Sequence, residues 1–475
     1  MTKKQFTTSK MFLLAVGQMG FIFLLGTLTL YTLRFYAPTE STGLPLLLPI
    51  GVIGIIQGIS IAFDALIDPW LASLSDNSKN PKGRRIPFMR KAAIPAALFC
   101  VLVFFAPVNE VSWINIVWVA VMLLLYCFCR SIYDINIRAL LPDVLPDAYK
   151  RTRYFVILSV FNTIGTLLLG TVPTIIAILE NVNVATLPAW RISLSVFPII
   201  GVIMMLIGAF SIKETDYVEP WHENSVTSGL FKSIKGVFKN KEFVTYLTGG
   251  MSLELAVGVF NAGLLFIIDL LLGLQGTMAT VVIGLVTIVA LLLYYPLLKL
   301  LKRIGKRKMI LFSVIVDALM FVLTFFAGPI SNLLGPGTVA AGGMWAGMAG
   351  EGAKVGSLVL LMFLGVLSAF PTSVGGAVGA SMFADLAQYN DVLTGQNSKG
   401  MVMGLTSMIG ALPSTLVPLV VGLFIYIGST NQMPTAQGVR ATMLVSIAFA
   451  AVAFIQFLRY NEKKILGVIA PENNG

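Results

Sequence analysis

Long apolar runs separated by short polar or basic segments dominate this chain of 475 residues. Most of the runs are near or above the roughly 20 residues with which an α-helix crosses a bilayer. The pattern predicts an all-α membrane protein with twelve transmembrane helices, at residues 11–36, 44–74, 91–107, 114–141, 154–179, 192–212, 243–272, 281–301, 309–330, 355–387, 401–427 and 441–458.

A long polar segment divides these predicted helices into two sets of six. We therefore expect an N-terminal six-helix bundle at 1–212, a cytoplasmic linker at 213–242 and a C-terminal six-helix bundle at 243–475. A glycine followed by basic residues recurs at Gly83 and Gly305, between the second and third helices of each set. Two parallel six-helix repeats would give this recurrence. A basic loop of the ordinary kind would give it equally well.

Composition agrees with a membrane protein and excludes a soluble one. The chain is 57% hydrophobic and 12% charged, and its mean hydropathy is +0.87. Its net charge of +11 does not indicate a nucleic-acid partner, because most lysines and arginines lie in alternate loops. The positive-inside rule then places both termini in the cytoplasm of a multi-pass protein of the cell membrane. The basic segments are at 3–10, 79–91, 150–153, 213–241 and 299–308, and after 458.

Residues typical of enzyme sites are scarce. The three cysteines lie in apolar runs, and the one histidine, His222, lies in the polar linker. No catalytic triad, zinc spacing or phosphate-binding loop is apparent. We therefore expect neither an enzyme nor a bound cofactor.

Two carboxylates inside the second apolar run are the first candidates for function. Asp64 and Asp68 are four residues apart, which places them on one helical face about 6 Å apart along the axis. A charge at that depth costs at least about 2.5 kcal/mol. The pair therefore requires a cation, a proton or a buried arginine, which is the chemistry of a cation-coupled carrier.

The fourth apolar run carries a second charged cluster. Arg130, Asp134 and Arg138 are spaced to share one face, and Ser131 lies beside them. In one interpretation Arg130 pairs with an aspartate, either Asp134 or one on the second helix, in a neutral buried network. In the other, the carboxylates hold a coupling ion and the arginines meet an anionic or polyhydroxyl solute. Both hold if the pairs break and re-form during transport.

Three segments resemble the glycoside–pentoside–hexuronide:cation symporters, which are melibiose-permease-like members of the major facilitator superfamily. The resembling residues are Asp64-x3-Asp68-Pro69-x2-Ala72-x2-Ser75-Asp76 with Gly83-Arg84-Arg85-Ile86-Pro87, Ala139-Leu140-Leu141-Pro142-Asp143 with Lys150-Arg151-Thr152-Arg153, and Ala384-Asp385-Leu386-Ala387-Gln388-Tyr389-Asn390-Asp391. The resemblance implies a two-bundle carrier that works by alternating access.

The resemblance also implies roles for single residues. Asp64 and Asp68 match the paired cation-site aspartates, Ser131 a hydroxyl of that site, and Asp134 an aspartate that binds sugar hydroxyls. Three positions depart from the pattern, and they are Ile22, Ile67 and Arg138. Ile67 replaces an amide ligand, which weakens the case for Na⁺ and favours H⁺. Ile22 replaces a carboxylate and Arg138 an aromatic, so an anionic sugar is one hypothesis. An Arg138 that snorkels to the membrane surface is the alternative.

The sequence thus predicts a cation-coupled symporter of a glycoside-like, possibly acidic, sugar. Asp64, Asp68 and Ser131 would bind the coupling ion, H⁺ or Na⁺, with Asp64 and Asp68 as metal ligands in the sodium case. Expected partners are a small solute and the lipid bilayer, with the chain a monomer. The alternatives are a carrier of lysophospholipid or another solute, and a non-transporting sensor. The residues expected to contact the solute are Asp134, Arg130, Arg138, Gln18 and Glu254.

Overall fold

The computed structural model describes most of the chain and divides it into two compact units. Unit 1 is Met1–Ser225 with Thr430–Pro434, and unit 2 is Val226–Ser429 with Thr435–Gly475. Of the predicted linker, residues 218–239 lie outside the described part. The described residues are 6–76, 78, 80–145, 148–217, 240–339, 348–350, 352–379, 382, 385–386, 389, 399–427 and 434–469.

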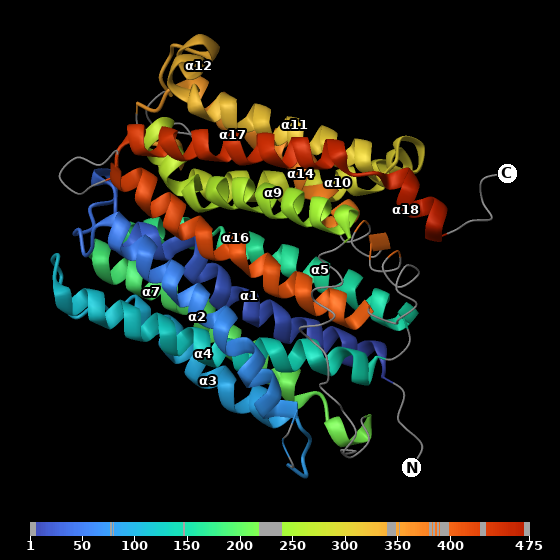
Figure 1. Cartoon of the computed structure of the whole chain (residues 1–475). Coiled ribbons are helices and arrows are strands. Elements are labelled where there is room, and N and C mark those ends of the chain that lie inside the picture. The colour runs from blue at the N-terminus through green and yellow to red at the C-terminus, as the bar shows by residue number, and fades with distance from the viewer. Residues whose placement is uncertain are drawn as a thin grey trace. The chain divides into compact units, whose positions relative to one another are not determined.

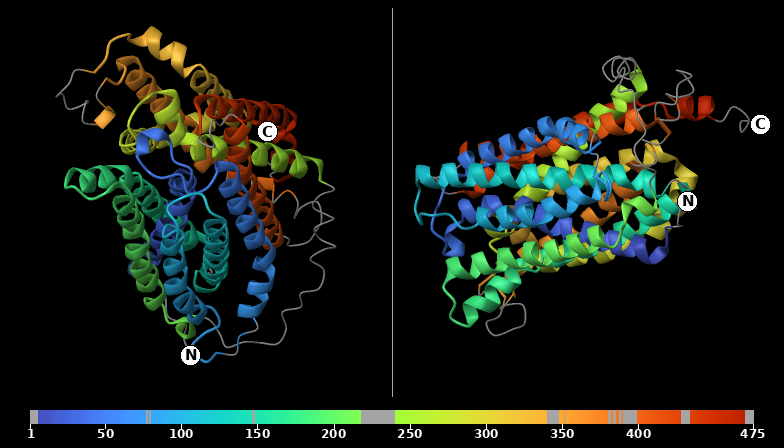
Figure 2. Two further views of the ribbon diagram at one scale, coloured as in Figure 1. Left: turned by 90° about the vertical axis from the view of Figure 1, so that its left-hand side faces the viewer. Right: turned by 90° about the horizontal axis from the view of Figure 1, so that it is seen from below.

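Unit 1 is a bundle of α-helices (Figure 1). α1 packs against α5 and α7, and α4 packs against α2 and α3. α4 thus contacts two helices, and the blue and cyan ribbons of all three can be followed in Figure 2. The helices are α1 (Thr8–Tyr36), α2 (Ile50–Asp76), α3 (Ile86–Val103), α4 (Trp113–Val144), α5 (Ala148–Leu169), α6 (Val172–Asn181) and α7 (Thr186–Phe210).

Unit 2 is a second helical bundle. α17 packs against α9 and α11, and α14 packs against α10. The helices are α9 (Lys241–Phe266), α10 (Met278–Ile304), α11 (Lys306–Phe325), α12 (Ala327–Leu334), α14 (Val355–Val374), α16 (Lys399–Ile427), α17 (Ala436–Arg459) and α18 (Glu462–Ile469).

Ten helices of the described part are long and apolar enough to cross a membrane. Two shorter apolar stretches, Met278–Leu293 in α10 and Leu412–Ile427 in α16, accompany them. The all-helical membrane architecture is therefore confirmed, whereas a total of twelve spanning helices stays a prediction.

Several predicted helix boundaries were wrong. The second run begins at residue 44, but its helix begins at Ile50, because Pro45 and Pro49 hold the preceding chain extended. The run at 154–179 is two helices, α5 and α6, which separate at Gly170 and Thr171. The run at 309–330 likewise covers two helices, because α11 ends at Phe325 and α12 begins at Ala327.

Glycines let α1 and α7 approach closely in unit 1. A Cβ atom on Gly20 would lie 2.3 Å from the carbonyl oxygen of Gly201, and one on Gly208 would lie 2.8 Å from the Cα of Gly17. No side chain fits at such distances, so the two helices touch through their backbones. Small residues commonly allow this packing between membrane helices.

The glycine-and-basic segment of unit 1 forms a clamp with the end of α7. The carboxylate of Glu214 accepts hydrogen bonds from the backbone N–H groups of Arg84, Arg85 and Ile86, at 2.9, 2.9 and 3.0 Å. These are orphan donors at the start of α3, where a negative charge is favourable. Arg90 donates in return to the carbonyl oxygen of Ala209 at the end of α7.

Unit 2 repeats this clamp with different residues. Glu462 accepts from the backbone N–H groups of Lys306 and Arg307, both at 2.9 Å, at the start of α11. The Arg307 side chain donates to the carbonyl oxygens of Phe457 and Leu458 at the end of α17. A generic basic loop does not require this matching geometry, so the two clamps support the predicted internal repeat.

Candidate functional site

Asp64 and Asp68 lie on α2, which packs against α4. Asp64 is buried, with 7% of the residue exposed. The Oδ1 atom of Asp68 is also buried and has no hydrogen-bond partner in the described part of the chain. The two aspartates therefore differ, because one is engaged and the other has an acceptor atom available.

Two side chains of α4 hold Asp64. Arg130 forms an ion pair through Nη2 with Oδ2 of Asp64. The hydroxyl of Ser131 donates a hydrogen bond to Oδ1 of the same carboxylate. The side chains of Arg130 and Asp64 are 14% and 11% exposed, so the pair is largely shielded from solvent. Of the partners that the sequence allowed for Arg130, the structure therefore shows Asp64.

Asp134 and Arg138 form the second ion pair, one turn further along α4. Nε of Arg138 lies 2.8 Å from Oδ1 of Asp134. The Arg138 side chain is 64% exposed and that of Asp134 is 16% exposed. The predicted shared face of these residues is confirmed for this pair. Arg138 is accessible, as a snorkelling residue would be, yet its guanidinium stays bound to a carboxylate of the cluster.

Asp68 lies within the electrostatic reach of the second pair. The charges of Asp134 and Arg138 act on its carboxylate. The cluster thus brings together three aspartates and two arginines from α2 and α4. If all of them are ionised, the cluster carries one net negative charge, which the binding of a single cation neutralises.

An aromatic side chain of α1 also contacts the cluster, and this contact was not predicted from the sequence. The Arg130 guanidinium lies 5.8 Å from the ring centroid of Phe21, within the range of a cation–π contact. Phe21 also stacks on Tyr133, at 6.1 Å between centroids and 15° between planes. Phe21 lies in a continuous apolar run, so its sequence context gives no signal of this contact.

The remaining predicted solute contacts are less closely tied to the cluster. Gln18 lies on α1, one turn from Phe21 and Ile22, and is partly buried. Glu254 lies on α9, in unit 2, and is exposed. In the third resembling segment Asp385 forms an ion pair with Lys306 at 2.5 Å, while residues 387–388 and 390–398 lie outside the described part.

A metal ion would have to use oxygens beyond the two aspartates. In the described part of the chain no three His, Cys, Asp or Glu side chains form a metal-binding group. Both oxygens of Asp64 already accept hydrogen bonds. Na⁺ prefers several oxygen ligands, as hard cations do, whereas a proton needs one carboxylate oxygen.

Comparisons with known proteins agree with a membrane carrier. A protein of Escherichia coli (strain K12) named "Putative sulfoquinovose importer" is 24% identical, covering 96% of this chain and 92% of its own. The lactose permease of Leuconostoc lactis is 25% identical over 70% of this chain and 54% of its own. A Salmonella typhimurium protein named "Putative 2,3-dihydroxypropane-1-sulfonate exporter" is 24% identical over 96% of this chain and 93% of its own.

Solved structures and a family comparison complete the assignment. The nucleoside transporter NupG shares the fold, with a TM-score of 0.61 and 13% identity over 96% of this chain and 98% of that one. Residues 13–461 match the family described as MFS/sugar transport protein. This multi-pass protein of the cell membrane is not an enzyme, and it belongs to the MFS/sugar transport family.

Proposed function

We propose that this protein is a proton-coupled symporter of a sugar that carries an anionic group. The observation that carries the proposal is the cluster on α2 and α4, in which two arginines each engage one aspartate. The third aspartate, Asp68, keeps a buried oxygen that has no hydrogen-bond partner among the described residues. A cluster with this charge balance accepts one cation and, after its ion pairs rearrange, one anion.

Asp68 is the proposed proton acceptor. Its Oδ1 atom is buried without a hydrogen bond from any described residue, which is costly for an ionised carboxylate in a low-dielectric bundle. Protonation removes the charge and supplies a donor. Asp64 is less suited to be the first acceptor, because Arg130 and Ser131 already stabilise its ionised form.

Arg138 is the proposed contact for the anionic group of the solute. Its guanidinium is exposed, and only its Nε atom is used in the pair with Asp134. A guanidinium binds carboxylate or sulfonate oxygens through two parallel N–H groups. The names of two relatives support this class of solute, because one is "Putative sulfoquinovose importer" and the other "Putative 2,3-dihydroxypropane-1-sulfonate exporter". The lactose permease makes a neutral sugar the competing hypothesis.

The proposed cycle links proton and solute through the ion pairs. A proton on Asp68 lowers the negative charge beside Asp134 and Arg138, which lets the solute anion approach Arg138. Asp134, released from its partner, then accepts hydrogen bonds from sugar hydroxyls. With the solute anion bound, the cluster would carry two net negative charges without the proton and one with it, and the smaller charge costs less in the occluded state.

The test measures accumulation of labelled sulfoquinovose in proteoliposomes that hold the full chain. A pH gradient, acidic outside, is imposed without sodium, and a sodium gradient is imposed separately at equal pH. The proposal expects accumulation with the pH gradient alone. It also expects the Asp68→Asn variant to lose accumulation yet to retain counterflow, because exchange does not require the proton to leave.

Lactose at the same concentration is the control for the anionic requirement. Accumulation of lactose but not of sulfoquinovose would overturn the solute class while leaving a carrier. Accumulation that follows only the sodium gradient would overturn the proposal that the coupling ion is a proton. Binding without counterflow of any tested sugar would favour a sensor over a carrier.

A further inference from the structure

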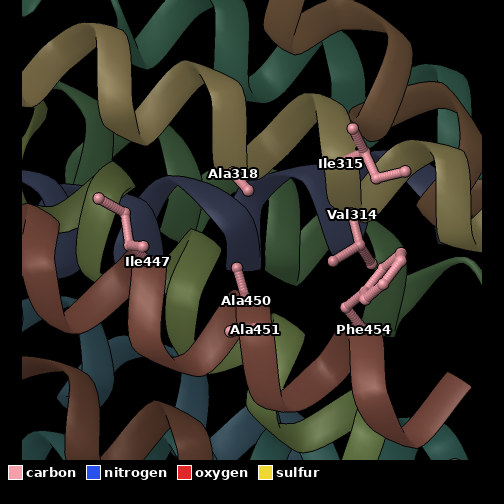
Figure 3. A pocket seen from close by; sticks show the side chains of 7 residues that line it. All are labelled: Val314, Ile315, Ala318, Ile447, Ala450, Ala451 and Phe454. Carbon is pink, nitrogen blue, oxygen red and sulfur yellow. The ribbon is translucent and has the colours of Figure 1, made fainter. Parts of the chain in front are cut away.

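A second feature, separate from the charged cluster of unit 1, is an apolar cavity between α11 and α17 in unit 2. Its volume is about 250 Å³, and only apolar side chains line it (Figure 3). The lining residues are Val314, Ile315 and Ala318 of α11 with Ile447, Ala450, Ala451 and Phe454 of α17. The proposed function makes no use of this cavity.

Three alanines create the hollow. Figure 3 shows Ala318 and Ala450 facing each other across its middle, with Val314 and Phe454 meeting at one end. Larger side chains at the alanine positions would fill the space. A cavity lined in this way has no polar partner to hold water and binds apolar matter.

The cavity opens outward from the bundle and is not sealed inside it. Ile315 is 49% exposed, and Ala451 is also exposed. Both helices are long and apolar enough to cross a membrane. The surroundings of an outward-facing groove on such helices are lipid acyl chains, which are apolar and flexible enough to enter it.

Cations gather where the groove meets the end of the two helices. Arg307 precedes Val314 by two helical turns, about 10 Å along the axis. Its Nε lies 3.2 Å from the carbonyl oxygen of Phe457, so the guanidinium bridges α11 and α17. Lys308 and Arg459 are exposed at the same two helix ends. In the described part of the chain neither of them forms an ion pair.

The acidic residues near these helix ends are already engaged. Glu462 accepts from the backbone at the start of α11. Asp385 pairs with Lys306, and Glu242 pairs with Lys464 at 3.4 Å. In the described part of the chain no acidic side chain pairs with Lys308 or Arg459, and their positive charge favours a mobile anion.

We propose that this groove binds an anionic phospholipid, with one acyl chain between α11 and α17 and the phosphate beside Arg307, Lys308 and Arg459. Basic residues at the mouth of an interhelical groove are the usual partners of anionic head groups. An acyl chain fits the wholly apolar lining of the cavity, whereas a free phosphate ion would leave the cavity empty. The net negative charge distinguishes this lipid from zwitterionic lipids around the protein.

The experiment measures retained lipid on the full chain. The protein is reconstituted in equal parts of phosphatidylglycerol and phosphatidylcholine, re-extracted in mild detergent, and weighed by native mass spectrometry. The wild type should retain phosphatidylglycerol in preference to phosphatidylcholine. Lys308→Gln should lower that preference about fivefold, the factor that one cation near an anionic surface contributes. Ala451→Leu, which fills the groove, should abolish retention of both lipids at this site.

Matched variants separate the site from general effects. Ala448→Leu adds the same side chain at an exposed position of α17 outside the groove, and Lys91→Gln removes the same charge from an exposed position of α3. Both should retain lipid as the wild type does. Equal retention of the two lipids by the wild type would overturn the proposal. So would equal loss in all four variants, or displacement of the lipid by inorganic phosphate.

Discussion

At the scale of single residues, the two aspartates of α2 differ in their contacts, although their sequence context is similar. Asp64 is held by Arg130 and Ser131, whereas Asp68 has a buried oxygen that no side chain or backbone group of the described residues contacts by a hydrogen bond. Substitution of each should therefore have separate consequences, one for stability and one for coupling. Spacing alone does not reveal this difference, because both residues lie on the same face of one helix.

Asp64→Asn should destabilise the protein by about 3–5 kcal/mol, because it leaves Arg130 buried without a counter-charge. Thermal unfolding of the purified protein in detergent measures the change. Asp68→Asn removes no ion pair and should unfold close to the wild type. The double variant Asp64→Asn with Arg130→Gln should recover part of the loss. Equal unfolding temperatures for the Asp64→Asn variant and the wild type would show that the pair contributes nothing to stability.

Arg138→Gln should weaken transport of an anionic sugar while leaving a neutral sugar unaffected. A hydrogen bond to a charged group contributes about 1.5–3 kcal/mol, so the KM should rise by about 10- to 100-fold. The KM of the Arg138→Lys variant should fall between those of the wild type and Arg138→Gln, since lysine keeps the charge and loses the planar fork. Concentration-dependent counterflow gives the KM values. A similar rise for lactose would mean that Arg138 acts on the fold or on Asp134 and not on the anion.

At the scale of elements, the two clamps join parts of each unit that are far apart in sequence. Glu214 lies about 130 residues after the helix start that it caps, in a polar stretch that carries no sequence signal of the contact. The recurring glycine-and-basic segments could be predicted, but their acidic partners could not. Side chains from η2 (Glu214–Asp216) and α18 reveal the repeat only in the folded chain.

Glu214→Gln and Glu462→Gln should each destabilise their unit by about 1–3 kcal/mol, because a neutral amide accepts more weakly from the helix N-terminus than a carboxylate does. Glu110→Gln, at an exposed loop position, is the matched control and should have no effect. Thermal unfolding followed by circular dichroism measures all three. The repeat predicts losses of similar size in the two units, and a loss in only one would argue against equivalent roles.

Gly20→Ala should separate α1 from α7, because the new Cβ would lie 2.3 Å from the backbone oxygen of Gly201. Overpacking of this kind costs about 1–3 kcal/mol, and backbone atoms have little room to yield. Gly250→Ala is the control, since nothing lies within 4 Å of its added Cβ. Unfolding temperatures again measure the outcome. A Gly20→Ala variant as stable as the wild type would mean that the two helices part without cost.

At the scale of the whole molecule, hydropathy predicted most of the architecture, because the bilayer imposes one length and one polarity on every spanning helix. The family followed from the motif around Asp64 and Asp68, and the comparisons confirm it. The sequence did not predict which charged residues pair with one another in the cluster. Arg130 had three aspartates within plausible reach, and helix rotation decides among them. The aromatic contact of Phe21 depends on how α1 packs beside α4, on which local sequence is silent.

The orientation of the chain in the membrane stays a prediction of its charge distribution. Basic residues cluster at the starts of α3 and α11 and after α17, so these ends should face the cytoplasm together with both termini. A green fluorescent protein fused after residue 475 should fluoresce, and alkaline phosphatase fused there should be inactive. Alkaline phosphatase inserted after Gly337, beyond the opposite end of α11, should be active. Active phosphatase at the C-terminus would show that the molecule is inverted, although coupled uptake would still require an inward proton gradient, because a symporter moves proton and solute in the same direction.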